Sequence, residues 1–316
     1  MLEIQKNIKL SDYSTFKIGG PAEFFVEVEN EEELLEAINY AKENNLKFFV
    51  LGGGSNILFA DEGFDGIIIK ISAQGGPASG WQNTSLKIWA GYSLSSLVNF
   101  AKENGLSGME WASGIPGTIG GAIRGNAGAF GGDMSNAILE VKVLDTEEVQ
   151  SSKLKVFSNK ECGFDYRNSI FKQNDNLVIV SAKIKLEKGN KEEIESKMKE
   201  ILTKRAEKQP KGWIGSSGSF FKNPIVENGE LIEKFEKDTG NKSMDGKIPA
   251  GWLIDEVGLR GKKIGNVMVS EENANFIINN DNGTAEEIVM LASIIKQKVR
   301  NEFGVQLKEE VKIVYY

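Results

Sequence analysis

The chain of 316 residues contains no histidine. Without an imidazole it cannot form a histidine-based triad, a zinc site built on histidine or a histidine general acid. Any proton transfer must therefore use the side chains of serine, tyrosine, lysine, arginine, aspartate or glutamate.

Other scarcities exclude further classes of protein. The single cysteine, Cys162, rules out an intramolecular disulfide and a cysteine-rich metal cluster. A net charge of −7 without a cluster of basic residues argues against nucleic acid as the main partner. No apolar run approaches the length of a membrane span, and residues 1–6 lack the apolar core and cleavage site of a signal peptide. We therefore expect a cytoplasmic protein without a membrane span.

Glycine, by contrast, is abundant and clustered, with 35 residues in the chain. An apolar strand predicted at residues 46–51 runs directly into the sequence GGGSNI at 52–57. Backbone N–H groups of such a loop can hold a diphosphate, although a tight turn is an equally good reading of this motif alone. The chain has neither a G-x-G-x-x-G fingerprint nor a Walker sequence, so a Rossmann site for a nicotinamide cofactor is excluded.

A second glycine-rich segment covers residues 105–132, and apolar residues and Asn126 interrupt its glycines. We expect no regular helix or strand there, but a wall of backbone close to a flat or anionic ligand. Two such loops suit a long cofactor with a pyrophosphate and a planar ring, which describes FAD. A cofactor that carries the chemistry would also explain how a histidine-free chain could be an enzyme.

The segment 208–224 joins the basic end of a predicted helix to a short apolar strand through a turn rich in glycine and serine. Its glycines can bend the backbone so that Ser219, just before two phenylalanines, is presented to a ligand. Lys208 and Lys222 flank this turn and could meet phosphates or simply be solvated.

Periodicity predicts an alternation of strands and helices. Expected strands are 24–28, 46–51, 66–71, 86–91, 138–145, 177–186, 274–279 and 307–316, and expected helices are 31–45, 95–104, 191–208, 250–258 and 284–303. Thr284 and Glu287 have the spacing of a capping box, and Gly304 is placed to end the last helix. Residues from 212 to about 303 are predicted to form a second domain.

Two polar pairs could contribute to a site. Arg167 follows Tyr166, and a guanidinium is the natural clamp for a substrate carboxylate. Glu309 and Glu310 are adjacent on the last predicted strand, so their side chains face opposite ways and only one could reach a given site.

Seven segments, in this order, resemble the UDP-N-acetylenolpyruvoylglucosamine reductase family, FAD enzymes of peptidoglycan precursor synthesis. They are 14–21 (STFKIGGP), 51–56 (LGGGSN), 114–122 (GIPGTIGGA), 125–128 (GNAG), 166–171 (YRNSIF), 218–224 (GSFFKNP) and 250–255 (AGWLID). The interval between Arg167 and Ser219 is short, as in the class that lacks an extra tyrosine-bearing loop. An ordered set of seven motifs over nearly the whole chain is highly specific.

The resemblance implies an α+β fold in which an FAD-binding domain of the vanillyl-alcohol-oxidase type, made of two α+β lobes, precedes an α+β substrate-binding domain. The FAD-binding region would cover 1–210, with lobes at about 1–72 and 73–210, and the C-terminal strand 306–316 would fold back onto it. The substrate-binding domain would cover 211–305.

The resemblance also implies an activity, the NADPH-dependent reduction of the enolpyruvyl group of a UDP-sugar through non-covalently bound FAD, by a chain that we expect to be a monomer. Arg167, Ser219 and Glu310 would be catalytic, and Tyr166, Lys208, Asn223 and Asn273 would bind substrate. The residues expected at the cofactor are Leu51, Gly52, Gly53, Gly54, Ser55, Asn56, Ile57, Ser113, Gly114, Pro116, Gly117, Thr118, Ile119, Gly121 and Asn126. No metal ligand is expected.

Four residues depart from the family pattern. Glu309 replaces a proline before the catalytic glutamate, which leaves the choice between Glu309 and Glu310 open. Asn273 stands where the family often has a histidine or glutamine that contacts substrate, so this contact is also open. Lys312 replaces an arginine, and Arg124 interrupts an apolar glycine loop.

Two other functions are compatible with parts of the pattern. A flavin oxidase of similar architecture could act on an alcohol or a sugar, although histidine-tethered FAD is impossible here. A nucleotide-binding regulator could keep the fold without turnover, but the set of Arg167, Ser219 and Glu310 argues against it.

Overall fold

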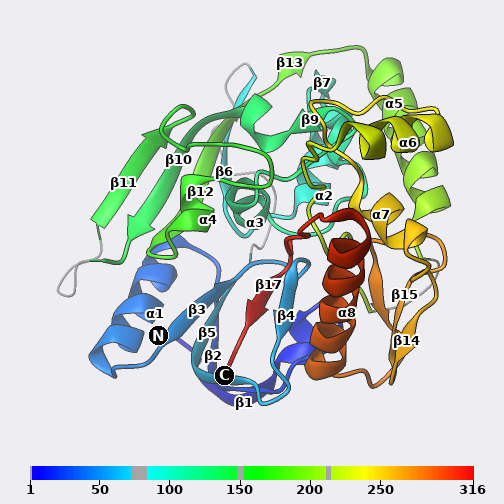
Figure 1. Ribbon diagram of the computed structural model, residues 1–316. Helices are drawn as coiled ribbons and strands as arrows, with labels where there is room; N and C mark the ends of the chain where they lie inside the picture. The colour runs from blue at the N-terminus through cyan, green and yellow to red at the C-terminus, as the bar shows by residue number, and fades with distance from the viewer. Residues whose placement is uncertain (1, 73–83, 148–152, 211–214) are drawn as a thin grey trace. The chain divides into compact units, whose positions relative to one another are not determined.

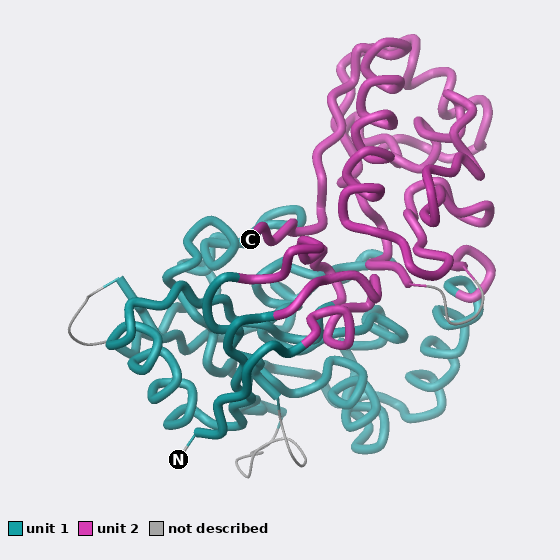
Figure 2. Tube along the Cα trace, turned by 90° about the horizontal axis from the view of Figure 1, so that it is seen from below, with its two compact units in different colours: residues 1–8, 22–54, 65–205 teal, residues 9–21, 55–64, 206–316 magenta. Residues whose placement is uncertain are grey.

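The computed structural model describes residues 2–72, 84–147, 153–210 and 215–316. The chain forms two compact units (Figure 2). Unit 1 contains residues 1–8, 22–54 and 65–205, and unit 2 contains residues 9–21, 55–64 and 206–316. The boundary that we expect near residue 210 between the FAD-binding region and the substrate-binding domain stays a prediction. Unit 2 also includes two short N-terminal segments, 9–21 and 55–64.

Helices and strands alternate along the chain (Figure 1). The α-helices are α1 (Glu31–Glu43), α2 (Leu94–Glu103), α3 (Ile119–Arg124), α4 (Ile170–Gln173), α5 (Lys191–Lys208), α6 (Gly229–Thr239), α7 (Ala250–Glu256) and α8 (Ala285–Phe303). The strands are β1 (Gln5–Lys9), β2 (Pro21–Val28), β3 (Phe48–Leu51), β4 (Ile57–Phe59), β5 (Phe64–Ile71), β6 (Ser85–Trp89), β7 (Leu106–Ser107), β8 (Gly128–Ala129), β9 (Gly132–Asp133), β10 (Ile138–Asp145), β11 (Lys153–Ser158), β12 (Leu177–Lys185), β13 (Glu187–Lys188), β14 (Lys263–Ile264), β15 (Val267–Val269), β16 (Ile277–Asn279) and β17 (Lys312–Val314).

Unit 1 is built on two four-stranded sheets, with strand orders β1-β2-β5-β3 and β11-β10-β12-β6. Strands β3 and β5 are parallel, whereas β10 pairs antiparallel with both β11 and β12. One hydrophobic core contains buried residues of both sheets and of helices α1, α2 and α3. This core fixes the end of β3, after which the first glycine loop begins.

Unit 2 packs helices α6, α7 and α8 around a second core that includes Phe16, Leu58, Phe220 and Phe221. Strands β14, β15 and β16 form an antiparallel sheet. The C-terminal strand β17 pairs in parallel with β4, so that Lys312 lies opposite Ile57. The end of the chain therefore returns to the segment that follows the first glycine loop.

Helix α8 shows how the local sequence sets a boundary. The Thr284 side chain accepts a hydrogen bond from the Glu287 N–H, and the Glu287 carboxylate accepts one from the Thr284 N–H, so the predicted capping box is confirmed. Gly304 ends the helix in the left-handed conformation at φ 69°. The apolar residues of α8 from Ile288 to Val299 that face the core repeat at helical spacing and are buried.

Some expectations are wrong in detail. Residues 119–124 form a short helix, α3, in the segment expected to contain no regular structure, because Thr118 caps it and its apolar face is buried. The last strand covers only residues 312–314, not 307–316. Helix α6 and the largely exposed strand β11 were not expected. Within the described residues, no helix combines the length and the apolar character that a membrane crossing requires.

The lone thiol gives a first prediction. Cys162 is fully buried, and burial raises its pKa to about 12. Since the thiolate is the reactive form, we expect the native protein at pH 8 to react with an aromatic disulfide reagent roughly a thousandfold more slowly than the unfolded chain. The raised pKa also stabilises the fold below the thiol's unfolded pKa of about 8.5, and this contribution is lost as the pH rises towards 12. Equal reaction rates in buffer and in denaturant would contradict the burial.

Candidate functional site

The two glycine loops meet within unit 1. A Cβ atom added to Gly53 would lie 2.7 Å from the Gly117 Cα, and one added to Gly52 would lie 2.6 Å from the Thr118 Oγ1. Gly117 has a φ of 119°, which L-residues rarely adopt. The two loops are therefore in close backbone contact, and their joint binding of a cofactor stays a prediction.

The segment before the second loop holds a buried hydroxyl. Ser113 is 2% exposed, and its Oγ has no hydrogen-bond partner among the described residues. Buried polar atoms are normally satisfied, so an orphan beside a glycine loop marks a place for a ligand atom. Arg205, at the end of α5, donates to the Gly114 carbonyl at 3.0 Å, and burial lowers the pKa of its guanidinium. These residues fit a cofactor that lies against backbone.

The predicted cofactor residues are distributed over both units. Leu51 to Gly54 and Ser113 to Gly121 lie in unit 1, whereas Ser55, Asn56 and Ile57 belong to unit 2. Asn126 is 3% exposed, and its amide donates to the Asp165 carbonyl at 3.1 Å and accepts from the Ser135 N–H at 3.1 Å. Backbone groups thus engage both ends of this amide, which favours a supporting role over direct binding of the cofactor.

Arg167 sits on a tight turn in unit 1. The backbone groups of Asp165 and Asn168 exchange hydrogen bonds of 3.1 Å across this turn. Arg167 itself has a φ of 52°, an unusual value for a non-glycine residue and one that is enriched at functional sites. The buried Ser169 donates to the Arg124 carbonyl at 2.7 Å and fixes the turn against the end of α3.

The side chain of Arg167 is also held. Its Nη2 donates to the Gly128 carbonyl at 2.6 Å, and its Cζ lies 5.5 Å from the centre of the Tyr166 ring. A guanidinium that is pre-oriented in this way can hold an anionic group with little loss of side-chain freedom. Arg124, which was noted as a departure in the glycine loop, forms an ion pair with Asp175 at 2.6 Å.

In unit 2, Ser219 is exposed, and the two residues that follow it are buried in the core. Gly218 precedes it with a φ of 79°, and the fully buried Phe220 follows it. The rings of Phe220 and Phe221 meet edge to face at 5.0 Å. Residues 211–214, which belong to the turn singled out in the sequence, lie outside the described residues.

Glu309 and Glu310 lie beside this segment and differ in their surroundings. The Glu310 N–H donates to the Phe220 carbonyl at 2.8 Å, and the Glu310 carbonyl accepts from the Asn56 amide at 3.2 Å. The Glu309 carboxylate forms an ion pair with Lys296 of α8 at 2.7 Å. Ser219, Glu310 and the end of the first glycine loop are therefore connected through neighbouring backbone in unit 2.

The residues predicted to bind substrate have structural contacts of their own. The Asn223 Oδ1 accepts from the Ala250 N–H at the start of α7, at 3.0 Å. The Asn273 Nδ2 donates to the Lys208 carbonyl at 3.4 Å, and its Oδ1 accepts from the Asn275 N–H at 3.0 Å. Asn273 thus connects Lys208 to the loop before β16, whether or not it also contacts substrate.

The sequence reading missed Asn275. This residue is 5% exposed, and its amide exchanges two hydrogen bonds with the backbone of Phe221. The available signal was an asparagine inside the apolar run 274–278, because a polar side chain in a buried strand needs a partner.

The two units contain different functional groups. Unit 1 supplies a backbone cradle, a buried hydroxyl and an oriented guanidinium. Unit 2 supplies an exposed serine in a segment whose backbone bonds to that of Glu310. The groups of unit 1 can hold a cofactor or stabilise an anion, and the serine of unit 2 can donate a proton.

Comparisons with known proteins agree with this inventory. Residues 209–314 match the family described as UDP-N-acetylenolpyruvoylglucosamine reductase, C-terminal domain, and residues 22–149 match an FAD binding domain. The chain is 37% identical over 308 residues to the UDP-N-acetylenolpyruvoylglucosamine reductase of Caldanaerobacter subterraneus subsp. tengcongensis, covering 98% of this chain and 92% of that protein. It is 35% identical over 314 residues to the protein of the same name from Solibacter usitatus, covering 99% and 97%.

A solved structure is also similar over its full length. The crystal structure of UDP-N-acetylenolpyruvylglucosamine reductase from Thermus caldophilus aligns with a TM-score of 0.77 and 32% identity, covering 99% of each chain. The expected α+β fold with an FAD-binding domain is thereby confirmed.

Proposed function

Because this chain belongs to the UDP-N-acetylenolpyruvoylglucosamine reductase family, we propose that Arg167, Ser219 and Glu310 carry the charge and proton chemistry of its reaction. The protein is an oxidoreductase that uses FAD and NADPH to reduce UDP-N-acetylglucosamine enolpyruvate to UDP-N-acetylmuramate, a step in peptidoglycan precursor synthesis. The bound FAD supplies the hydride that it receives from NADPH.

The backbone cradle and Ser113 are proposed to hold the cofactor. Close contact of Gly52 and Gly53 with the second loop leaves room for backbone but not for side chains. The Ser113 hydroxyl, which has no partner among the described residues, could bond to a polar cofactor atom. Each of the other residues predicted at the cofactor stays a prediction.

Arg167 is proposed to grip the substrate carboxylate. After hydride addition to the terminal vinyl carbon, negative charge builds on the carbon beside the carboxylate and spreads into it. A permanently charged guanidinium stabilises this charge most effectively when it is already oriented. The contacts of Arg167 with Gly128 and Tyr166 support that orientation.

Ser219 is proposed to complete the reduction by protonating this carbon. The Ser219 O–H bond breaks, a C–H bond forms, and the serine oxygen recovers a proton through neighbouring groups. The observation that carries this assignment is the exposed position of Ser219 between a left-handed glycine and a fully buried phenylalanine. Of the two adjacent glutamates, Glu310 is proposed to assist, because it matches the family's second glutamate near the carboxyl end and its backbone bonds to the segment that carries Ser219.

The two glutamates provide matched variants. We expect Glu310→Gln to slow oxidation of the reduced enzyme by the enolpyruvyl substrate at least tenfold, with reduction by NADPH unchanged, because a poised carboxyl group is lost. Glu309→Gln removes a partly exposed ion pair outside the proposed chemistry and should leave both rates within about twofold. Stopped-flow measurement of the two half-reactions separates these outcomes, and slowing by Glu309→Gln alone would reverse the assignment.

Substrate contacts by Tyr166, Lys208, Asn223 and Asn273 stay predictions, as do the monomeric state and the cytoplasmic location. For Asn273 the contact with the Lys208 carbonyl supports an indirect role, in which the amide orients Lys208. Sedimentation of the purified protein would test the monomeric state.

A further inference from the structure

The side chain of Asn275 forms hydrogen bonds with the backbone of Phe221, two residues after the proposed proton donor Ser219. Its Nδ2 donates to the Phe221 carbonyl at 2.9 Å, and its Oδ1 accepts from the Phe221 N–H at 3.0 Å. The side-chain amide thus replaces the peptide group of a neighbouring strand. The Asn275 carbonyl accepts a third hydrogen bond, from the Phe220 N–H, at 2.7 Å.

The segment that carries Ser219 is held on two sides. On one side lie these contacts with Asn275, and on the other the Phe220 carbonyl accepts from the Glu310 N–H, and the Lys222 N–H donates to the Lys308 carbonyl. Among these contacts only the two from the Asn275 amide involve a side chain, so a substitution can remove them while the backbone pairing stays.

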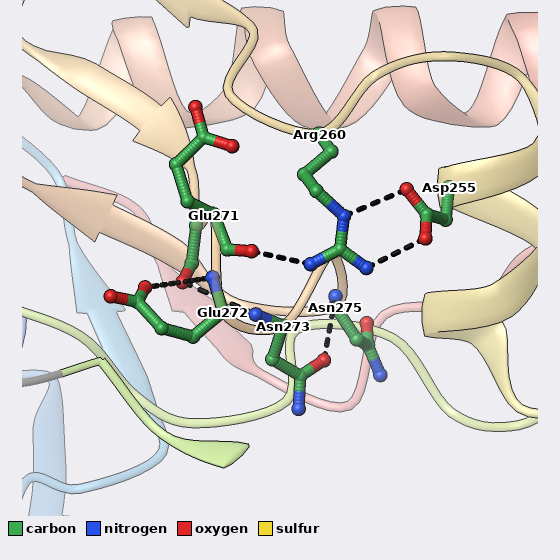
Figure 3. A network of polar contacts seen from close by, with 7 residues as sticks. Asp255, Arg260, Glu271, Glu272, Asn273 and Asn275 are labelled. Atoms are coloured by element: carbon green, nitrogen blue, oxygen red, sulfur yellow. Dashed lines mark hydrogen bonds and ion pairs between the residues drawn. The ribbon is translucent and has the colours of Figure 1, made fainter. Parts of the chain in front are cut away.

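Asn275 is itself fixed by the loop that precedes it (Figure 3). The fully buried Ser270 accepts hydrogen bonds from the N–H groups of Glu272 and Asn273. Arg260 forms a bidentate ion pair with Asp255 and donates to the Glu271 carbonyl. The Arg260 guanidinium holds the pKa of Asp255 below its ordinary value, so this anchor stays charged at neutral pH.

Ser219 depends on this support because it is exposed and follows a glycine. Gly218 has a φ of 79°, and a Cβ added there would meet nothing within 4 Å, so no side chain packs this position. A proton donor must lie within hydrogen-bond reach of its target, and a displacement of about 1 Å can cost roughly a hundredfold in rate.

We propose that Asn275 is a positioning residue that sets the place of Ser219 by clamping the backbone of Phe221. This inference rests on the proposed role of Ser219 as the proton donor. Asn275 does not touch substrate in this proposal, so its contribution appears in the step that Ser219 serves and not in reduction by NADPH.

The test compares two equally buried asparagines of unit 2. Asn275 and Asn279 are each 5% exposed, and the Asn279 side chain bonds to Phe16, Asp281 and Gly283 but not to residues 219–221. We expect Asn275→Leu to slow oxidation of the reduced enzyme by substrate at least tenfold, with NADPH reduction within about twofold. Asn279→Leu should lower the melting temperature without this selective slowing.

Hydrogen exchange and a second variant of Asn275 test the same contact. Hydrogen exchange of the Phe221 amide should accelerate in Asn275→Leu, because that amide loses its acceptor, and should not change in Asn279→Leu. If Asn275→Leu does not fold, Asn275→Asp keeps the acceptor for the Phe221 N–H and loses only the donor to its carbonyl. Equal slowing of both half-reactions, or equal rates for the two leucine variants, would overturn the proposal.

A double variant separates this inference from the proposed function. If Ser219 is the donor and Asn275 acts through it, Asn275→Leu should add little to the slowing already caused by Ser219→Ala. Fast oxidation in Ser219→Ala alone would defeat the proposed function. Slow oxidation in Ser219→Ala together with normal oxidation in Asn275→Leu would defeat only the positioning role.

Discussion

In the variant Ser219→Ala, oxidation of the reduced enzyme by the enolpyruvyl sugar nucleotide should be at least a hundredfold slower than in the parent enzyme. General acid catalysis contributes about 10²- to 10⁴-fold, so the loss raises the barrier by about 3 kcal/mol or more. Hydride transfer from NADPH requires no proton from serine, and its rate should stay near that of the parent. Stopped-flow absorbance at the flavin band measures each half-reaction separately.

Ser293→Ala is the control for loss of a serine hydroxyl in unit 2, because Ser293 is exposed on α8 and its Oγ donates to the Val289 carbonyl of the same helix. Removing that hydroxyl should leave both rates near normal. Equal slowing of both half-reactions in Ser219→Ala would mean that the variant disturbs the whole enzyme, and the assignment of Ser219 as donor would fail.

Gly53→Ala should weaken FAD binding roughly tenfold to a hundredfold, the range that an overpacking penalty of about 1–3 kcal/mol produces. The new methyl carbon would lie 2.7 Å from the Gly117 Cα and 3.3 Å from its carbonyl carbon. Both atoms are backbone, so relief requires the two loops to separate, and the proposed cradle then loses its shape. The flavin-to-protein absorbance ratio and titration of the apoprotein with FAD measure the effect.

Gly125→Ala serves as its control in the same glycine-rich region. Gly125 has an ordinary right-handed conformation, with φ −87°, and an added Cβ would lie 3.6 Å from the Gly121 carbonyl oxygen, a normal contact. This variant should bind FAD as the parent does. Full FAD occupancy in Gly53→Ala would show that the contact between the loops does not shape the cofactor site.

The sequence was most informative where local chemistry decides the structure. The capping box of α8 needs only Thr284, Glu287 and the apolar positions that follow. The glycines of both loops indicated a close approach of the backbone to a neighbour, because residues without side chains are needed there, but not that the two loops approach each other. The family motifs added the cofactor and the reaction, which periodicity and spacing could not supply.

What the sequence did not disclose depends on contacts between distant segments. The clamp of Asn275 on Phe221 joins residues 54 positions apart, and no local pattern encodes such a pair. Residues 119–124 include two adjacent glycines, so propensity argues against a helix, and the helix depends on its cap and on burial of Ile119 and Ile123. The contact of Glu310 with the segment of Ser219 likewise joins distant parts of the chain, since the Glu310 N–H donates to the Phe220 carbonyl.

The parallel pairing of β4 with β17 has a consequence for synthesis of the protein. Residues 57–59 are synthesised long before their strand partner, residues 312–314. The edge of β4 can gain this partner only after residues 312–314 have left the ribosome, so unit 2 folds late relative to the synthesis of its first segments. Until then the unpaired edge of β4 could pair with another chain, which makes this stage of synthesis the one most exposed to aggregation.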